Sequence, residues 1–428
     1  MFKLLAIIGF AGNLASASEW PQFRGPNRDA VWNEHGLATS FATNDLRIRW
    51  RKPIGAGWSS PVVASGKVFV TDSKLMKPLA KERVHCFDEK TGATLWEFDY
   101  PVSYPEFSFN PEHGSGPTPT PIVEGGRVYV VGANGDVHCL KTKKGAVVWE
   151  KHLSKEYQVA EMSCRPSPLI EGNLLILFTG ARPSASVMAL DKKSGKEVWK
   201  SLDDHVSNSS PIVITAGGKR QLIVWTAQSV SSLNPATGEV YWREEMVTSN
   251  NDSIPTPVVQ KNRLLVGGLM MELDAHQAAA AILWPNSKAA ASKRILSNTS
   301  TAILKGEYVY SAKSSGELVC LEASSGKHVW QTTNVTTLQT GASINMTTRG
   351  DDVYLFTDRG DLIQAQLTPA GYREISRARL LEPTTPFFGK NFAWTPPAYA
   401  NRCVFARTDA EIVCASLAEK HSRGRFGN

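Results

Sequence analysis

Short apolar stretches alternate with polar turns along this chain, and one arrangement of them recurs. Each unit opens on a proline-containing segment, runs through alternating apolar strands and a glycine turn, and ends in a strand that closes on tryptophan. One unit reads TPTPIVEGGRVYVVGANGDVHCLKTKKGAVVWE, up to Glu150. Alternation with a period of two is typical of half-buried β-strands, and no helical period is present. The pattern therefore predicts an all-β protein built from repeats.

The spacing of the repeat tryptophans sets the size of each unit. From Trp96 to Trp330 they are separated by 53, 50, 43, 42 and 46 residues. A four-stranded propeller blade takes about 40–50 residues. Eight units can be traced, although the fifth has AHQAAAAILW in place of its glycine turn and the seventh has Ile375 where tryptophan is expected.

The two ends of the repeat region complete each other. The eighth unit, AWTPPAYANRCVFARTDAEIVCASL, stops after its third strand, whereas LRIRWRKP is a lone tryptophan-ended strand ahead of the first unit. Adding this strand to the last blade closes the ring and removes an exposed sheet edge. We therefore predict one eight-bladed β-propeller of four-stranded blades over residues 46–417, in which the N-terminal strand completes the last blade.

Three repeated positions have predicted structural roles. The turn glycines supply a positive φ at low energy. The tryptophan four residues later offers a flat surface to the neighbouring blade. The expected docking tryptophans are Trp50, Trp96, Trp149, Trp199, Trp242, Trp284 and Trp330. Cysteines recur at one position, as Cys86, Cys139, Cys320 and Cys414. We predict buried thiols there, because equivalent positions on face-packed sheets lie about 10 Å apart, whereas a disulfide needs Cα atoms within about 7 Å.

The N-terminus resembles an export signal. Lys3 precedes a mostly apolar run over residues 4–14, and Ala15-Ser16-Ala17 has the small-x-small pattern of a signal-peptidase site. A buried N-terminal helix is the alternative. The run is shorter than the roughly 20 residues that span a membrane, and no cysteine follows it to carry a lipid. We predict a signal peptide at 1–17, an N-terminal extension at 18–45, and a periplasmic or secreted protein without a transmembrane anchor.

Composition and charge exclude some classes of protein and of binding partner. Of the 428 residues 42% are hydrophobic and 20% are charged, which excludes an intrinsically disordered chain. The formal net charge of +7 comes from scattered residues, and only the tail at 418–428 is locally basic. This distribution argues against a nucleic-acid partner. We expect a monomeric propeller.

The turn pattern also carries a family resemblance. CFDEKTGATLW and ALDKKSGKEVW are similar to the tryptophan-docking repeat of the PQQ-like (pyrroloquinoline quinone) β-propeller family, and WPQFRGPNRD resembles the opening of its secreted bacterial members. The family includes quinoprotein alcohol dehydrogenases and the propeller lipoprotein of the outer-membrane barrel assembly machine. The resemblance covers nearly all of residues 46–417. It implies the fold specifically and the function much less so.

A candidate site lies where the segments before the innermost strands converge on the central channel. Polar and aromatic residues in these segments predict a small-molecule or anion site. Its candidate residues are Trp58, His113, Arg165, His205, Asn208, Asp252, Asn298, Lys390 and Trp394. The alternative is that these residues cap strand ends and bind channel water.

The resemblance to the dehydrogenases implies PQQ in the channel and a calcium ion held by Glu, Asn and Asp. Candidate calcium ligands are Asn250, Asn251 and Asp252, whose oxygen atoms suit that ion. The dehydrogenases cover the cofactor with adjacent cysteines, whereas no two cysteines are adjacent here. No catalytic residue can be assigned by the resemblance. We therefore predict a scaffold that binds a protein or small-molecule partner, with a PQQ- and calcium-dependent alcohol dehydrogenase as the alternative.

Overall fold

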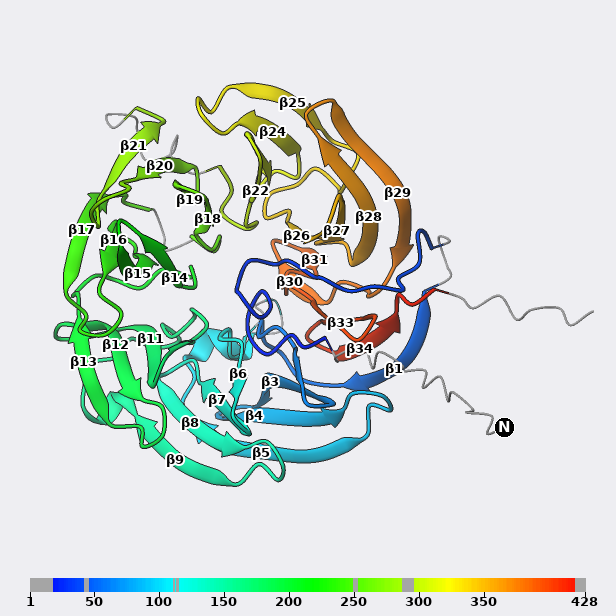
Figure 1. The fold of residues 1–428 in the computed structure, drawn as a ribbon. Helices are drawn as coiled ribbons and strands as arrows, with labels where there is room; N and C mark the ends of the chain where they lie inside the picture. Colours follow the sequence, from blue (N-terminus) through cyan, green and yellow to red (C-terminus); the bar gives the residue numbers. More distant parts are fainter. Residues whose placement is uncertain are drawn as a thin grey trace, which may run out of the picture.

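The protein is an eight-bladed β-propeller. The computed structural model describes residues 18–41, 46–110, 112, 115–248, 253–286 and 296–419. These residues form eight four-stranded antiparallel sheets arranged in a ring, and the first strand of each blade lies nearest the centre (Figure 1). No helix in the described ranges is long and apolar enough to cross a membrane. The predicted signal peptide, residues 1–17, lies outside the described residues.

The first four blades follow one another along the chain. Blade 1 contains β2 (Val62–Ala64), β3 (Lys67–Met76), β4 (Leu79–Asp88) and β5 (Thr94–Val102). Blade 2 contains β6 (Ile122–Glu124), β7 (Arg127–Val131), β8 (Asp136–Lys141) and β9 (Val147–His152). Blade 3 contains β10 (Leu169–Glu171), β11 (Leu174–Ala181), β12 (Ala185–Asp191) and β13 (Glu197–Ser201). Blade 4 contains β14 (Ile212–Ala216), β15 (Lys219–Trp225), β16 (Ser229–Leu233) and β17 (Val240–Glu245).

The remaining blades complete the ring. Blade 5 contains β18 (Val258–Gln260), β19 (Arg263–Val266), β20 (Leu269–Leu273) and β21 (Ala280–Trp284). Blade 6 contains β22 (Ile303–Lys305), β23 (Tyr308–Ala312), β24 (Leu318–Glu322) and β25 (His328–Thr332). Blade 7 contains β26 (Ile344–Arg349), β27 (Asp352–Thr357), β28 (Asp361–Thr368) and β29 (Gly371–Arg379). Blade 8 contains β32 (Ala398–Ala400), β33 (Cys403–Arg407), β34 (Glu411–Ser416) and β1 (Arg47–Pro53). Outside the blades lie the hairpin β30 (Thr385–Phe387) and β31 (Lys390–Phe392) and the 3-10 helices η1 (Glu106–Phe109) and η2 (Leu153–Lys155).

The N-terminal strand closes the ring, as predicted. Strand β1 pairs with β34 and forms the outer edge of blade 8. Its Trp50 lies opposite Cys414, in the same register as Trp96 opposite Cys86 in blade 1. A strand from the start of the chain therefore completes the last repeat without a change of pattern. All six cysteines are buried free thiols.

The repeat tryptophans join neighbouring blades through the glycine turns. The Trp199 indole of blade 3 donates to the Pro235 carbonyl in the turn of blade 4, at 3.1 Å. Equivalent bonds reach the next turn from Trp50, Trp96, Trp149, Trp284 and Trp330. Trp242 differs, because its indole donates to Gln221 Oε1 within its own blade at 3.1 Å. Blade 5, which follows Trp242, lacks the glycine turn that accepts this bond in other blades.

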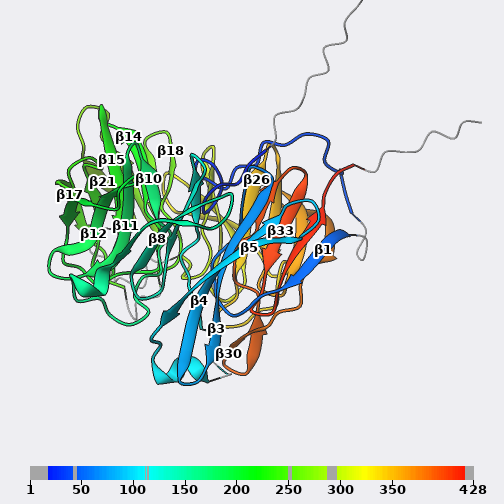
Figure 2. The same ribbon diagram turned by 90° about the horizontal axis from the view of Figure 1, so that it is seen from below.

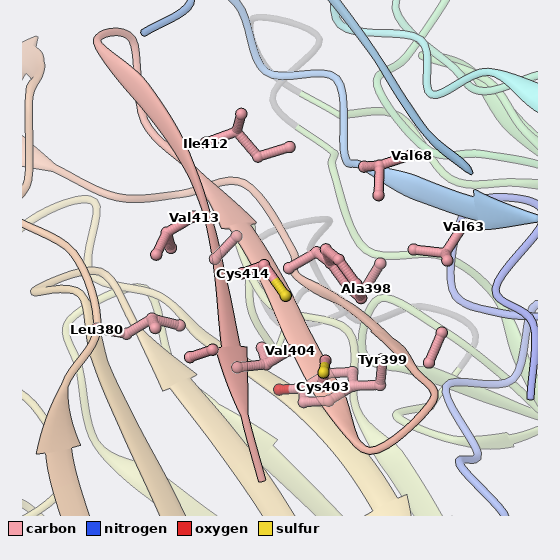
Figure 3. Packing of buried hydrophobic residues seen from close by; sticks show 14 of the residues in the cluster. Val63, Val68, Leu380, Ala398, Tyr399, Cys403, Val404, Ile412, Val413 and Cys414 are labelled. Carbon is pink, nitrogen blue, oxygen red and sulfur yellow. The ribbon is translucent and has the colours of Figure 1, made fainter. Parts of the chain in front are cut away.

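The N-terminal extension is part of the core around the closure. Trp20 and Trp32 are 2% exposed and pack on Tyr399 of blade 8, with ring centroids 5.7 and 5.2 Å apart. Figure 3 shows part of the same cluster, in which Ala398 and Tyr399 of blade 8 lie on the side of Val63 of blade 1. Residues ahead of the first strand therefore stabilise the contact between the first and last blades.

A buried histidine makes the stability of the fold depend on pH. His138 on β8 is 1% exposed and packs against Phe98 and Tyr100, with ring centroids 5.1 and 4.3 Å away. Burial lowers its pKa to about 4, although Asp136 and Glu150 oppose this shift. The folded chain therefore binds this proton less well than the unfolded chain does. The free energy of unfolding is unaffected by His138 above about pH 6.5, and it falls as the pH drops from there toward 4.

We expect the free energy of unfolding to fall by about 3 kcal/mol more in the wild-type protein than in His138→Leu on going from pH 7.5 to pH 4, since one pKa unit corresponds to about 1.4 kcal/mol. Urea titrations at the two pH values measure the difference. His328→Leu replaces an exposed histidine on β25 and serves as the control. Equal pH dependence in the wild-type protein and His138→Leu would contradict the assignment.

Candidate functional site

A belt of hydroxyl groups joins the segments that precede the innermost strands. The Ser60 amide donates to Thr120 Oγ1 of the next blade at 3.0 Å, and the Thr120 amide donates to Ser167 Oγ at 3.0 Å. The Ser167 amide in turn donates to Ser210 Oγ at 2.9 Å. A similar bond joins Thr256 to Thr301. The belt supplies hydrogen-bond acceptors to backbone amides ahead of the innermost strands. In this part of the predicted channel mouth, the hydroxyl groups therefore hold neighbouring blades together.

The sequence analysis did not single out these hydroxyl residues. Their signal is the Ser-Pro or Thr-Pro dipeptide that opens several repeats, as in SSPVV and TPTPIV. By itself, the dipeptide predicts only the start of a strand. Its recurrence in the same register, one blade after another, is the feature that predicts contacts between blades.

The described members of the predicted site have separate surroundings. The Arg165 side chain donates through Nε to the Met162 carbonyl at 3.1 Å, within its own loop. His205 is exposed, and its amide donates to Gln228 Oε1 at 3.0 Å. Asn298 uses its backbone, which donates to Ser314 Oγ at 2.8 Å and accepts from Ile254 at 3.2 Å. Asn208 is partly buried in the loop before β14.

The two predicted tryptophans differ in whether the indole N–H has a hydrogen-bond partner. The Trp394 indole donates to the Gly341 carbonyl at 2.7 Å, and its ring stacks on Phe392 with centroids 4.7 Å apart. The Trp58 amide donates to the Pro117 carbonyl at 3.0 Å, but its buried indole nitrogen has no hydrogen-bond partner among the described residues. Trp394 thus holds neighbouring segments together, and Trp58 carries an unused donor.

Four of the candidates cannot be placed. His113 and the predicted calcium ligands Asn250, Asn251 and Asp252 lie outside the described residues. Within the ranges that the structure describes, no group of three His, Cys, Asp or Glu side chains is arranged to hold a metal ion. The calcium site at residues 250–252 therefore stays a prediction.

The N-terminal extension lies across the inner strands on one side of the ring (Figure 2). Trp20 forms a bridge with Val63 of blade 1, and Val31 forms one with Thr348 of blade 7. Between these bridges, Arg28 reaches blade 3, where its Nη1 donates to the Pro168 carbonyl at 2.8 Å. Burial lowers the pKa of Arg28 to about 9. The chain itself therefore covers part of the ring centre on this side.

The opposite side carries two projections (Figure 2). One is the long hairpin of β3 and β4 with η1 beside it, joined by an ion pair between Lys77 and Glu106. Leu79 and Phe107 at this tip are 66% and 56% exposed. The other is the hairpin β30–β31, whose Phe388 is 85% exposed. We call this side, with Leu79, Phe107 and Phe388, the projecting face.

A polar hollow of about 460 Å³ lies beside the second projection. Its lining residues are Thr337, Gln339, Arg359, Glu382, Pro383, Lys390 and Asn391. Behind it, Asp358 is fully buried and accepts hydrogen bonds from Thr336 and Gln339, both at 2.7 Å. Burial raises the pKa of the Asp358 carboxyl. Lys390 is the predicted site residue that lines this hollow.

Comparison with a family model and with known sequences points to the same family each time. The model of the family described as outer membrane protein assembly factor BamB matches residues 80–332 and 183–423. The chain is 22% identical over 242 residues to the protein of that name from Yersinia pestis, a region covering 55% of each chain. It is 25% identical over 290 residues to the protein of that name from Moranella endobia, covering 63% of this chain and 70% of the other.

Two solved structures share the fold. BamB from Moraxella catarrhalis superposes with a TM-score of 0.56 at 15% identity, covering 88% of this chain and 98% of that one. Quinohemoprotein alcohol dehydrogenase from Comamonas testosteroni superposes with a TM-score of 0.62 at 13% identity, covering 96% and 82%. At these identities the likeness concerns the fold alone, and it does not choose between a scaffold and an enzyme.

Proposed function

The chain belongs to the family described as outer membrane protein assembly factor BamB, and on this premise we propose that it is a protein-interaction scaffold in the assembly of outer membrane proteins. The chain spans about half the length of the Yersinia pestis relative that it matches, so the role of that protein is carried over as a proposal. The observation that carries it is the projecting face, where Leu79, Phe107 and Phe388 are more than half exposed. Large exposed apolar side chains gathered on one side of a folded protein are typical of contact surfaces for other proteins.

A complementation experiment tests the scaffold. The gene is deleted in the source organism, and folded outer membrane β-barrel proteins are quantified after complementation. We expect the wild-type chain to restore them and the double variant Leu79→Glu, Phe107→Glu to fail, because charges at the hairpin tip oppose burial against a partner. Val198→Glu, on the outer strand of blade 3 at a site 51% exposed, is the control and should restore them. Full restoration by the double variant would contradict the use of this face.

Export is part of the proposal. Assembly of outer membrane proteins requires a protein on the periplasmic side, and the predicted signal peptide at 1–17 supplies the route. We expect N-terminal sequencing of the mature protein to begin at Ser18. A mature chain that still begins at Met1 would contradict the predicted cleavage.

The alternative remains a PQQ- and calcium-dependent alcohol dehydrogenase. Titration of the purified chain with PQQ and calcium, followed by dye-coupled oxidation of an alcohol, decides it. Stoichiometric binding with dye reduction would support the enzyme. No binding at micromolar PQQ would leave the scaffold as the proposal.

A further inference from the structure

The tip of the hairpin β30–β31 displays an aromatic residue in an unfavourable conformation. Phe388 and Gly389 form the two-residue turn, and both have a positive φ, +46° and +72°, as a type I′ turn requires. Such turns favour Asn-Gly, because asparagine tolerates the left-handed region and an aromatic residue does not. Phe388 is also 85% exposed, so its ring gains little from burial. Local stability does not explain phenylalanine at this position, and this points to a role outside the fold.

The base of the hairpin is held firmly. The ring of Phe387 lies 4.5 Å from Phe388 and 5.0 Å from Trp394, centroid to centroid. Trp394 in turn stacks on Phe392 and donates to the Gly341 carbonyl at 2.7 Å. Gly341 precedes blade 7, so the aromatic base joins the hairpin to the ring. Phe388 is therefore presented from a fixed position.

The hollow beside this hairpin is cationic. Arg359 and Lys390 line it, and among the described residues neither has a carboxylate within 4.0 Å. Glu382, the acidic residue of the lining, is engaged by Arg379 at 3.2 Å. The Arg359 guanidinium is held against β31 by a bond from Nη1 to the Asn391 carbonyl at 2.9 Å. Arg359 also interacts, beyond ion-pair distance, with the Asp358 carboxylate behind the hollow. Two cations without a direct ion pair in one concave surface favour an anionic ligand.

The edge of β31 also faces the hollow. Asn391 lies opposite Pro386, next to the Phe387–Lys390 pair that closes the two-residue turn. Pairs in an antiparallel ladder alternate, so the backbone groups of Asn391 point away from β30. The Asn391 carbonyl accepts a hydrogen bond from Arg359, on the side of the hollow. An extended chain lying there would meet a strand edge, two cations and the Phe388 ring together.

We propose that Phe388 and this hollow bind an extended segment of a partner polypeptide that carries a carboxylate next to an apolar side chain. The inference rests on the proposed scaffold function and assigns it a second contact, separate from the tip of β3–β4. A small inorganic anion would use the cations alone and would leave Phe388 unexplained. A purely apolar segment would leave Arg359 and Lys390 unpaired.

The test uses the purified full chain and a fluorescein-labelled hexapeptide of alternating Glu and Phe, with fluorescence anisotropy as the readout. We expect the peptide to bind, and the matched peptide with Gln in place of Glu to bind at least fivefold more weakly. Raising the salt concentration should remove most of this preference, because exposed charges are screened. No binding of the Glu peptide by the wild-type chain up to millimolar concentration would overturn the proposal, as would equal affinity for the two peptides.

Variants of the chain separate binding from folding. Phe388→Asn creates the preferred Asn-Gly turn, so we expect its thermal midpoint to be maintained or raised while its affinity for the Glu peptide falls at least tenfold. Lys390→Gln should weaken binding two- to fivefold and reduce the preference for Glu over Gln. Val198→Asn and Lys327→Gln, at exposed positions elsewhere, are the matched controls. Wild-type affinity in both Phe388→Asn and Lys390→Gln would overturn the proposal.

The complementation assay distinguishes this inference from the scaffold itself. If the Leu79→Glu, Phe107→Glu variant fails to restore outer membrane proteins while Phe388→Asn restores them fully, the scaffold stands and the second contact is wrong. If both fail while the Val198 control succeeds, both proposals are supported. If both restore fully, the projecting face is not a docking surface and both are overturned.

Discussion

Alanine at Gly238 is expected to destabilise the protein by about 2–5 kcal/mol, because two unfavourable effects combine at this turn of blade 4. Gly238 has a φ of +76°, and a left-handed conformation costs a residue with a Cβ roughly 1–2 kcal/mol. The added Cβ would also lie 2.5 Å from the ring of Trp199, the docking tryptophan of blade 3. Overpacking of this kind costs about 1–3 kcal/mol.

The Trp199 ring cannot simply move away from the new methyl group. Its indole nitrogen is bonded to the Pro235 carbonyl at 3.1 Å, three residues before Gly238 in the same turn. Displacing the ring would break that bond and open the contact between blades 3 and 4. The strain must therefore remain in the turn or weaken the interface.

Gly218→Ala is the matched control. Gly218 lies in the same blade and has a φ of +69°, but a Cβ there would meet nothing within 4 Å. We expect it to cost only the backbone contribution of about 1–2 kcal/mol. Urea titrations of the two variants measure the difference. Equal destabilisation would mean that the glycine serves the turn alone and that close approach of the tryptophan adds nothing.

The glycines of these turns have two roles: they adopt a positive φ, and they leave room for a tryptophan of the neighbouring blade. The sequence predicted the first role but not the second. The turn pattern indicated a positive φ, and the tryptophan four residues later indicated docking, because both signals are local. Their meeting across blades was expected only in general terms. The close approach to the docking tryptophan recurs at Gly92, Gly145, Gly195 and Gly326, and it explains why one motif can repeat around a ring.

The contacts of the N-terminal extension and of the hairpin β30–β31 were harder to predict, because these two segments belong to no repeat. Arg28 contacts Pro168, 140 positions along the chain, and nothing near either residue indicates the contact. The hairpin β30–β31 lies between two repeats, where the sequence predicted only that Lys390 and Trp394 belong to a segment before an innermost strand. Lys390 was selected for its charge, whereas Phe388 was overlooked, because an exposed aromatic residue in a turn has no periodic signature.

The second large effect is expected at the junction between the last and first blades. Arg407 on β33 is fully buried, and its guanidinium donates to backbone carbonyls alone among the described residues. Nη1 reaches the Thr71 carbonyl of blade 1 at 2.7 Å, and Nη2 reaches the Gly55 carbonyl at 2.6 Å. Burial lowers the Arg407 pKa, and the nearby carboxylates of Asp409 and Asp72 oppose that shift.

Arg407→Met should lower the free energy of unfolding by about 3–5 kcal/mol, because it removes the donors to the Thr71 and Gly55 carbonyls and the buried cation near Asp72. Arg407→Lys keeps the charge and part of the bonding, so it should recover a portion of the loss. Urea titrations of the full chain measure both variants.

Arg220→Met is the control for this prediction. Arg220 also joins adjacent blades, through an ion pair with Glu171 at 2.7 Å, but its side chain is 49% exposed. An exposed pair contributes about 0–1 kcal/mol, so this variant should be nearly as stable as the wild-type protein. Equal losses of unfolding free energy in Arg407→Met and Arg220→Met would mean that the burial of Arg407 adds nothing to its contribution to stability. A larger loss at Arg407 would show that two kinds of contact close the ring: the pairing of β1 with β34 and the bonds from Arg407 to the backbone. Both join segments from opposite ends of the propeller sequence, so both form only when the ring is closed.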